Sequence, residues 1–276
     1  MADALELRTG QSTELLKELH ILTRDGKLNQ DSRRKLKQVN HLYHFIEPLL
    51  KDVGQDIQLV DHGAGKSYLG FILYDLFFKE LAGTSHIFGI ETRSELVEKS
   101  QELAKRLGFE RMSFLNFSVT DSITSGALPS NVDVVTALHA CNTATDDAIR
   151  FALAKQAKFI VLVPCCQAEV AALLKKNKPQ AMKHALSEIW RHPLHTREFG
   201  SQVTNVLRCL QLEAQGYQVT VTELVGWEHS MKNELIIARK QEQANRRAAE
   251  RLQEMLDILE LTELSDRFFV SSICKP

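Results

Sequence analysis

Short apolar runs alternate with amphipathic stretches along the middle of the chain. The apolar runs read as strands, and they cover residues 56–61, 86–91, 112–117, 132–139 and 158–163. The stretches between them place apolar residues at helical spacing, so they read as helices. This βαβα rhythm predicts a doubly wound, mostly parallel sheet with helices on both of its faces.

The chain before this alternation reads as helical from residue 12 to residue 50. Candidate helix caps are Ser12-Thr13 for a first helix and Asp31 or Ser32 for a second. One apolar face of the second helix is formed by Leu36, Val39, Leu42 (or Tyr43) and Ile46. We therefore expect a helical N-terminal extension over residues 1–54.

A different pattern begins after Pro164. Helical stretches cover roughly 166–190 and 200–214, and two further strands, 216–226 and 234–240, look like a closing pair. With these two strands the expected sheet has seven strands, and we expect its domain to cover residues 55–240. A charged amphipathic helix from residue 239 on predicts a helical C-terminal extension over 241–276.

Composition narrows the class of protein. The chain has 276 residues, 44% of them hydrophobic and 25% charged, with a formal net charge of -1. These values fit an ordinary soluble globular protein and exclude a uniformly basic nucleic-acid binder. The start lacks a basic region followed by an apolar run, and no apolar run is long enough for a membrane span. Five cysteines, two of them adjacent, do not look like a disulfide framework, so we expect a cytoplasmic setting and no membrane partner.

The segment Val-Asp-His-Gly-Ala-Gly-Lys-Ser has the features of a ligand-binding loop. It follows the carboxyl end of the first strand, where ligands bind in open parallel sheets. Gly63 and Gly65 let the backbone turn tightly and approach a ligand, and the next helix points its free N–H groups to the same place. The spacing differs from the phosphate loop of nucleotide hydrolases and from a full dinucleotide fingerprint. An acid before the first glycine, Asp61, suits a ligand with a cationic group.

Two more acids follow later strands. Glu91 ends the second strand, 26 residues past Gly65, where a carboxylate accepts hydrogen bonds from ribose hydroxyls. Asp121 follows the third strand, where an adenine amino group is within reach of a carboxylate. Each acid alone is more often a helix cap. Together with the glycines, they favour a nucleoside-binding site.

On these residues, the segment from about 56 to 240 resembles class I S-adenosylmethionine-dependent methyltransferases. The resemblance implies S-adenosyl-L-methionine as the cofactor. It assigns a loop around the methionine part of that cofactor to Asp61, Gly63, Ala64 and Gly65. It also implies Glu91 as the acid that binds the ribose and Asp121 as a neighbour of the adenine. Ser67 stands where many members have a third glycine.

Histidine and cysteine residues follow the fourth and fifth strands. We expect them at one edge of the sheet, beside the proposed cofactor, and they are His139, Cys141, Cys165 and Cys166. Their two segments resemble those of the group that contains the eukaryotic tRNA acceptor-stem 2′-O-methyltransferases and the glutathione-S-transferase C-terminal-domain-containing protein. The matching residues are Leu138, His139, Cys141, Ala144, Thr145, Asp146, Cys165 and Cys166. The tRNA enzymes continue with histidines where this chain has Gln167-Ala168.

Several roles for these residues stay open. Cys165 or Cys166 can attack a pyrimidine ring as a nucleophile if the thiol pKa is lowered. The histidine and the cysteines can instead bind zinc, although adjacent cysteine side chains diverge, and we predict no metal. The cysteines can also pack as small apolar residues beneath a ligand. His139 can hold the cofactor or accept a proton, whereas Thr145 or Asp146 reads as the cap of the helix that it opens.

The turn between the closing strands adds a further candidate. It contains Trp227, His229, Lys232 and Asn233. Lys232 can contact a phosphate or assist the deprotonation of a hydroxyl, and a solvated turn is the alternative. The candidate catalytic residues are therefore His139, Cys165, Cys166 and Lys232.

Basic residues gather in three segments, 24–37, 175–197 and 239–251. The second follows the Cys pair and would cover the substrate, which favours a phosphate-bearing acceptor such as RNA. A solvated helix face is the alternative. The sequence thus predicts a methyltransferase that acts on RNA, at a ribose 2′-hydroxyl or a base. A protein substrate, or a methyltransferase-like scaffold that binds RNA or protein without activity, is the alternative.

Overall fold

A computed structural model of the chain describes residues 7–8, 10–27, 30–138, 140, 142–165, 167–177, 185–224, 234–241 and 243–269. The chain divides into two compact units. The first contains Met1–Val134 and Leu224–Asn233, and the second contains Val135–Glu223 and Glu234–Pro276. The domain boundaries predicted after residues 54 and 240 stay a prediction.

Three strands of the first unit pair in parallel. They are β1 (Gln58–His62), β2 (His86–Ile90) and β3 (Met112–Leu115). The register places Asp61 of β1 opposite Gly89 of β2. All three lie within two residues of the predicted bounds, because their short apolar runs are bounded by polar turns.

Helices of the first unit precede, connect and follow these strands. They are α1 (Thr13–Glu18), α2 (Gln30–Val53), α3 (Tyr68–Leu76), the short 3-10 helix η1 (Phe78–Glu80), α4 (Ser94–Arg106) and α5 (Val119–Thr124). Ser12 caps α1 as predicted, because its side chain accepts a hydrogen bond from the Leu15 N–H at 3.2 Å. The prediction of a cap at Asp31 or Ser32 is wrong, since α2 already begins at Gln30.

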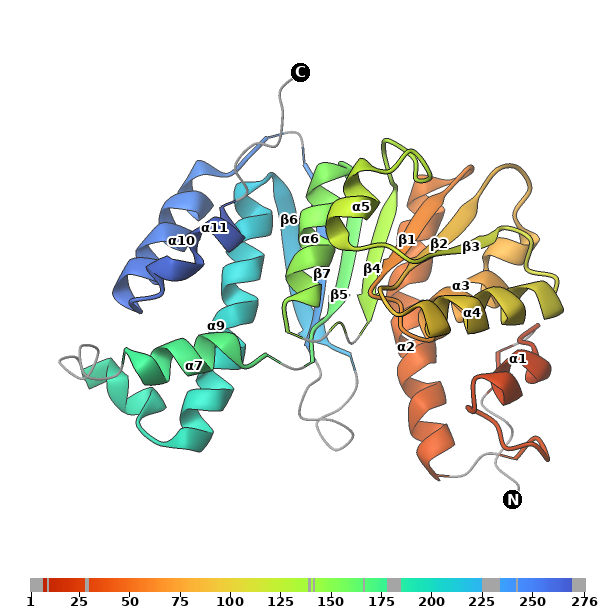
Figure 1. The fold of residues 1–276 in the computed structure, drawn as a ribbon, viewed down its shortest axis with the longest axis horizontal. Coiled ribbons are helices and arrows are strands. Elements are labelled where there is room, and N and C mark those ends of the chain that lie inside the picture. The colour runs from red at the N-terminus through yellow and green to blue at the C-terminus, as the bar shows by residue number, and fades with distance from the viewer. Residues whose placement is uncertain are drawn as a thin grey trace. The chain divides into compact units, whose positions relative to one another are not determined.

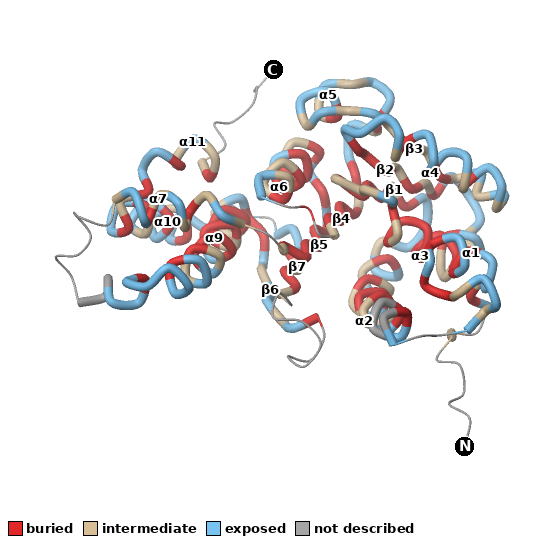
Figure 2. Tube along the Cα trace, turned by 60° about the horizontal axis from the view of Figure 1, so that its bottom comes forward, coloured by how far each residue is buried: buried red, intermediate tan, exposed pale blue. Residues whose placement is uncertain are grey.

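The predicted apolar face of α2 is confirmed. Leu36, Leu42, Tyr43 and Ile46 are each at most 4% exposed, and Val39 is 8% exposed. Helix α3 contacts both α2 and β2, and α4 contacts β3. Figure 2 shows the buried stripes along these helices and strands.

The second unit contributes the remaining strands. β5 (Phe159–Val163) is buried along its whole length, as expected for a central strand with both faces covered. β7 (Glu234–Lys240) pairs antiparallel with both β5 and β6 (Tyr217–Glu223), which confirms the predicted closing pair. With β4 (Val134–Leu138), the seven-stranded sheet has the order β3-β2-β1-β4-β5-β7-β6 (Figure 1). The predicted fold class, a doubly wound and mostly parallel sheet with helical extensions, is confirmed.

Helices of the second unit depart from the prediction in their bounds. They are α6 (Ala144–Ala154), α7 (Glu169–Lys176), the 3-10 helix η2 (Ala185–Trp190), α9 (Pro193–Ala214), α10 (Arg246–Ile258), η3 (Thr262–Leu264) and α11 (Ser265–Phe268). The helix predicted over 166–190 is wrong as a single element, because α7 ends at Lys176. Helix α9 begins earlier than residue 200, since Pro193 is well suited to a first helical position.

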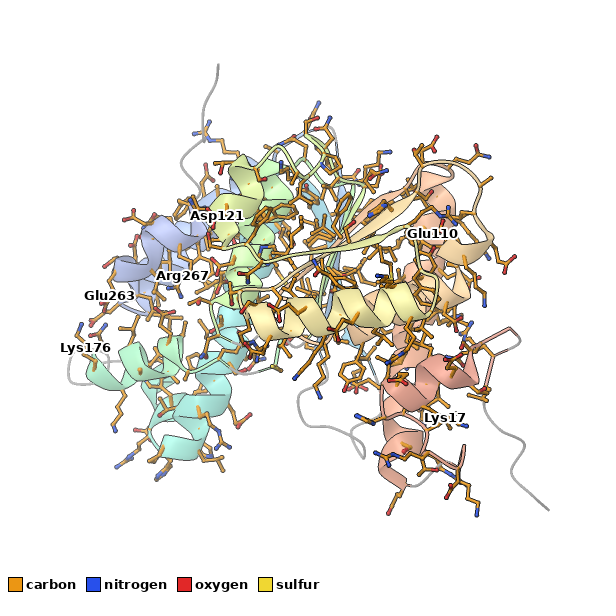
Figure 3. All side chains as sticks on the ribbon, turned by 45° about the vertical axis from the view of Figure 1, so that its right-hand side comes forward. Lys17, Glu110, Asp121, Lys176, Glu263 and Arg267 are labelled. Atoms are coloured by element: carbon orange, nitrogen blue, oxygen red, sulfur yellow. The ribbon has the colours of Figure 1, made fainter. Side chains whose placement is uncertain are left out.

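Four of these helices, α7, α9, α10 and α11, share a hydrophobic cluster. We call it the helical cluster, and its buried members are Val170, Leu174, Trp190, Val203, Leu207, Leu210, Ala248, Leu252, Leu256, Leu259, Leu261, Leu264 and Phe268. Ion pairs cross its rim, from Lys176 to Glu263 at 3.3 Å and from Arg267 to Glu169. Figure 3 labels Lys176, Glu263 and Arg267 on this part of the chain. The helices on either side of β6 and β7 in the sequence are thus packed on one another.

Across the part of the chain that the structure describes, none of the helices combines the length and the apolar character needed to cross a membrane.

Candidate functional site

The loop between β1 and α3 bends tightly at its two glycines. The φ angles are +67° at Gly63 and +58° at Gly65, values that glycine adopts without strain. The Ala64 N–H donates to the Ile90 carbonyl at 2.9 Å, and the Ser67 N–H donates to the Ala64 carbonyl at 2.7 Å. Backbone hydrogen bonds therefore hold the loop against the end of β2.

Glu91 joins this loop through its carboxylate. Its Oε2 accepts a hydrogen bond from the Gly65 N–H at 2.8 Å. Its Oε1 accepts from the backbone N–H groups of Thr92 and Arg93, at 3.0 and 3.1 Å. The residue is only 8% exposed. The predicted ribose acid thus lies directly beside the predicted methionine-side loop.

Arg93 covers the same carboxylate from the solvent side. Its Nε donates to Oε1 of Glu91 at 3.0 Å and its Nη2 donates to Oε2 at 3.2 Å. Burial raises the pKa of the Glu91 carboxyl, but the hydrogen bonds and charge of Arg93, together with the Gly65 N–H, outweigh burial and lower it. The carboxylate is therefore ionised and able to accept hydroxyl donors once the exposed Arg93 side chain moves aside.

Asp61 lies deeper, at the end of β1. It is 2% exposed, and its Oδ2 accepts a hydrogen bond from the Ser67 hydroxyl at 3.4 Å. Ser67 itself is fully buried and has a left-handed φ of +50°. A Cβ on Gly70 would lie 2.6 Å from the Ser67 hydroxyl oxygen, so Gly70 makes room for this side chain. Ser67, at the position where many methyltransferases have a third glycine, therefore holds the Asp61 carboxylate by a hydrogen bond.

Asp121 lies apart from this group in its hydrogen bonding. It stands in the first turn of α5, is exposed, and forms a reciprocal capping box with Ser118. Figure 3 labels Asp121. Both Ser118 groups that bond it, the hydroxyl at 2.6 Å and the N–H at 3.2 Å, lower the pKa of the Asp121 carboxyl. Its predicted place next to an adenine stays a prediction.

The residues that the structure brings together fit a sulfonium nucleoside. Two buried carboxylates, Asp61 and Glu91, flank a loop whose backbone bends at Gly63 and Gly65. Carboxylates suit the cationic amino acid part and the ribose hydroxyls of such a ligand, and the bend permits close approach of backbone N–H groups. The predicted cofactor residues Asp61, Gly63, Ala64, Gly65 and Glu91 therefore form one contiguous set in the first unit.

Most of the candidate catalytic residues lie outside the described residues. These are His139, Cys166 and Lys232, and Cys141 and the other residues singled out in the turn, Trp227, His229 and Asn233, lie outside as well. Cys165 is described, and it is half-buried. The roles proposed for the Cys pair and for His139, including the zinc alternative, stay predictions.

Sequence reasoning missed the partner of Asp146. The helix that Asp146 opens has Thr143 at its cap position, without a side-chain cap bond, and Thr145 donates instead to the Ala140 carbonyl at 2.6 Å. Asp146 accepts two hydrogen bonds at 2.8 Å from the guanidinium of Arg208 on α9. The prediction that Thr145 or Asp146 caps α6 is therefore wrong. Nothing in the sequence around Arg208 indicates that it pairs with Asp146, 62 residues away. The pairing of Arg93 with Glu91 was missed too, but it was predictable because the two residues are only two positions apart.

The fold and the site together define a class. A doubly wound sheet carries a glycine bend after β1 and a buried acid after β2, an arrangement that binds nucleoside cofactors at the carboxyl ends of the strands. A family model described as "Methyltransferase domain" matches residues 34–173, half of the chain. The chain belongs to this family. The predicted resemblance to methyltransferases is confirmed at the level of the family.

Curated relatives are similar over most of this chain. Proteins named "Glutathione S-transferase C-terminal domain-containing protein" from Mus musculus and from Homo sapiens are each 23% identical over 233 residues. Each match covers 78% of this chain and 34% of the relative. The chain thus spans about a third of the length of these relatives.

A solved structure is similar in fold. It is the magnesium protoporphyrin IX methyltransferase from Synechocystis PCC 6803 with bound SAH, which is 14% identical to this chain. The match covers 84% of this chain and 96% of that one, with a TM-score of 0.49.

Proposed function

We propose that the protein transfers a methyl group from S-adenosyl-L-methionine to RNA, at a ribose 2′-hydroxyl or a base. The hydrogen-bonded pair of Gly65 and Glu91, in a chain of the methyltransferase family, is the observation that carries the donor half of the proposal. The donor supplies an electrophilic methyl carbon; the acceptor atom forms a bond to it, the sulfur takes back the electron pair, and the acceptor loses a proton.

Residues of the first unit hold the donor in this proposal. Asp61 and the loop from Gly63 to Gly65 bind its methionine part, and Glu91 binds its ribose. Asp121 contacts the adenine, which requires the exposed capping carboxylate to keep one oxygen free for the amino group. His139 is a further candidate contact to the donor.

The proton of the acceptor needs a base. His139 is one candidate, since an imidazole can accept a proton, and Lys232 serves the same purpose if its ammonium is deprotonated. Cys165 and Cys166 are the candidates for contact with the acceptor base or ribose. We assign the reaction to the domain predicted over residues 55–240 and, from the cysteine usage, to the cytoplasm.

The exposed basic side chains support a polyanionic acceptor. In the three basic segments the described lysines and arginines whose exposure is known are all exposed: Arg24, Lys27, Arg33, Lys37, Lys175, Lys176, Arg191, Arg197, Arg239, Lys240, Arg246, Arg247 and Arg251. Some face acids, such as Arg191 with Glu188 at 3.0 Å. Exposed ion pairs contribute little, about 1 kcal/mol or less, so a phosphate can displace the acid.

A hollow beside the cofactor loop adds to this support. It has a volume of about 270 Å³, and its lining includes Lys66, Lys99 and Arg106 against the acids Glu18 and Glu102. Lys66 belongs to the glycine loop itself. Three cations against two acids leave a positive balance next to the proposed donor, which favours a phosphate over an acidic protein surface.

Donor binding is tested by calorimetric titration of the full chain with S-adenosyl-L-methionine. Asp61→Ala and Gly65→Arg are expected to abolish binding. Gly108→Arg is the matched control, since Gly108 has a similar φ of +68° and a Cβ there would meet no atom within 4 Å. Undiminished affinity in both site variants, or equal loss in the control, contradicts the donor site.

Acceptor identity is tested with radiolabelled donor and total RNA or total protein. Label in RNA that is lost with Gly65→Arg supports the proposal. Label in protein alone selects a protein methyltransferase, and label in neither pool, with donor binding intact, selects a methyltransferase-like scaffold. Mass spectrometry of nucleosides from cells with and without the gene then identifies the methylated atom.

A further inference from the structure

A buried guanidinium holds together segments of the second unit that are far apart in the sequence. Arg208 of α9 is 1% exposed. Its Nε and Nη2 donate to the two carboxylate oxygens of Asp146, both at 2.8 Å. Its Nη2 also donates to the backbone carbonyl of Asn142 at 3.0 Å. The bidentate pair and the carbonyl contact fix the segment that leads from β4 into α6.

The other end of the guanidinium reaches the segment after β5. Nη1 of Arg208 donates to Oε1 of Gln167 and, at 3.3 Å, to Oδ1 of Asn205. Nε2 of Gln167 donates to Oδ1 of Asn205 at 2.6 Å and to the carbonyl and hydroxyl of Ser201 at 3.2 and 3.3 Å. Nδ2 of Asn205 donates to Glu234 at 2.6 Å, which is the first residue of β7.

We call these residues the Arg208 network: Asn142, Asp146, Gln167, Ser201, Asn205, Arg208 and Glu234. Three of them adjoin candidate catalytic residues in the sequence. Asn142 stands three residues after His139, Gln167 directly follows Cys166, and Glu234 stands two residues after Lys232. One connected set of hydrogen bonds thus anchors the chain next to each of the three segments.

We propose that Arg208 and Gln167 are positioning residues for methyl transfer: the network fixes Asn142, Gln167 and Glu234, which stand close in the sequence to His139, the Cys pair and Lys232. This inference rests on the proposed function of those residues. Arg208 does not contact the acceptor itself, because all five of its N–H donors are used within the network and it is buried. A phosphate would find no donor there.

Positioning matters because in-line transfer tolerates little displacement of the acceptor atom from the methyl carbon. The Arg208 network is suited to this purpose by its connectivity. Gln167 accepts from Arg208 and donates to Asn205, beside the direct hydrogen bond from Arg208 to Asn205 at 3.3 Å. Its neutral amide can be removed without leaving a charge unpaired.

The test compares Gln167→Ala with Gln211→Ala in the full chain. Gln211 is a buried glutamine of α9, 2% exposed, whereas Gln167 is half-buried; Gln211 donates to the Arg267 carbonyl at 3.2 Å, outside the network. Three quantities are measured: donor affinity by calorimetry, the alkylation rate of Cys165 by peptide mass mapping, and the rate of label transfer to RNA at saturating donor.

In Gln167→Ala we expect faster alkylation of Cys165 and a kcat lowered at least about tenfold, with an unchanged affinity for the donor. In Gln211→Ala all three quantities are expected to match the unchanged chain. Equal changes in both variants, or a Cys165 rate unaffected by Gln167→Ala, overturn the proposal. If the unchanged chain binds no donor, the proposed function fails, whereas the comparison of Cys165 rates still decides whether the network positions this segment.

Discussion

The Gly65 N–H donates to Oε2 of Glu91 at 2.8 Å, across 26 residues of sequence. The bond joins the loop after β1 to the carboxylate after β2, so the two halves of the proposed cofactor site are held as one piece. The other acceptor positions of Glu91 are taken by Arg93 and by the backbone of residues 92 and 93. Changes at this carboxylate are therefore the most direct probe of the site.

Replacing the carboxylate by an amide is expected to weaken donor binding. Glu91→Gln removes the negative charge and replaces one accepting oxygen by an NH₂ group, which cannot accept from a ribose hydroxyl. A hydrogen bond to a charged group, worth about 1.5–3 kcal/mol, is then lost. The dissociation constant for S-adenosyl-L-methionine should rise about 10- to 100-fold in a calorimetric titration. The control is Glu95→Gln, an exposed acid in the first turn of α4. An unchanged dissociation constant would remove Glu91 from the donor site.

Arg93 competes with the ribose in this arrangement. Because its side chain is 60% exposed, its pairing with Glu91 contributes at most about 1 kcal/mol. Arg93→Ala should therefore tighten donor binding, by up to about fivefold. Arg93→Lys keeps the positive charge but loses the bidentate contact. Its donor affinity should lie between those of the unchanged chain and Arg93→Ala. Weaker binding in Arg93→Ala would show instead that the arginine orients the carboxylate for the ligand.

Acid should destabilise the protein through His62. Burial lowers its pKa to about 4, although the charge of Glu91 opposes this. The folded pKa lies below the ordinary value of 6.5, so the unfolded chain binds the extra proton, and stability is lost as the pH falls from 6.5 toward 4. The loss by pH 5 is on the order of 2 kcal/mol, or about 5 °C in Tm.

His62→Gln should reduce the fall in Tm between pH 7.5 and pH 5 by about that amount, measured by scanning fluorimetry. The control is His44→Gln, which changes an exposed histidine of α2. A pH dependence that survives His62→Gln unchanged would assign the acid sensitivity to other groups.

The helical cluster should matter for stability without affecting the donor. Leu256 is fully buried in it, so Leu256→Ala is expected to cost about 2–5 kcal/mol in urea unfolding. Ile258, two residues further along α10, is 62% exposed, and Ile258→Ala should change the free energy of unfolding by about 0.5 kcal/mol or less. Donor affinity should be the same in both variants, since the cofactor residues lie in the other unit. A small effect of Leu256→Ala would mean that the cluster is loosely packed.

Local patterns predicted the strands and the grouping of Asp61, the two glycines and Glu91. The apolar runs that end at Asp61 and Glu91 located the strand ends to within one residue, and a parallel sheet brings these ends to one edge. The apolar face of α2 followed from spacing alone. These features depend on residues near one another in the sequence, where periodicity and turn chemistry decide the structure.

Long-range pairing was not predictable from the same patterns. Asp146 and Arg208 are 62 residues apart, and the acid reads locally as a helix cap. Its partner, Arg208, comes within reach only when α9 packs in the folded chain, and the local spacing of residues does not predict that packing. The helical cluster escaped prediction for the same reason, since Val170 and Phe268 come together only in the folded chain.

The helical cluster also constrains the order of biosynthesis. Helices α7 and α9 leave the ribosome well before Leu252, Leu256 and Phe268, which cover their apolar faces. During translation those faces are exposed until nearly the last described residue has emerged, the condition under which nascent chains aggregate or engage chaperones. A chain truncated before Leu252 should therefore give less folded protein, although it keeps every residue of the proposed cofactor site.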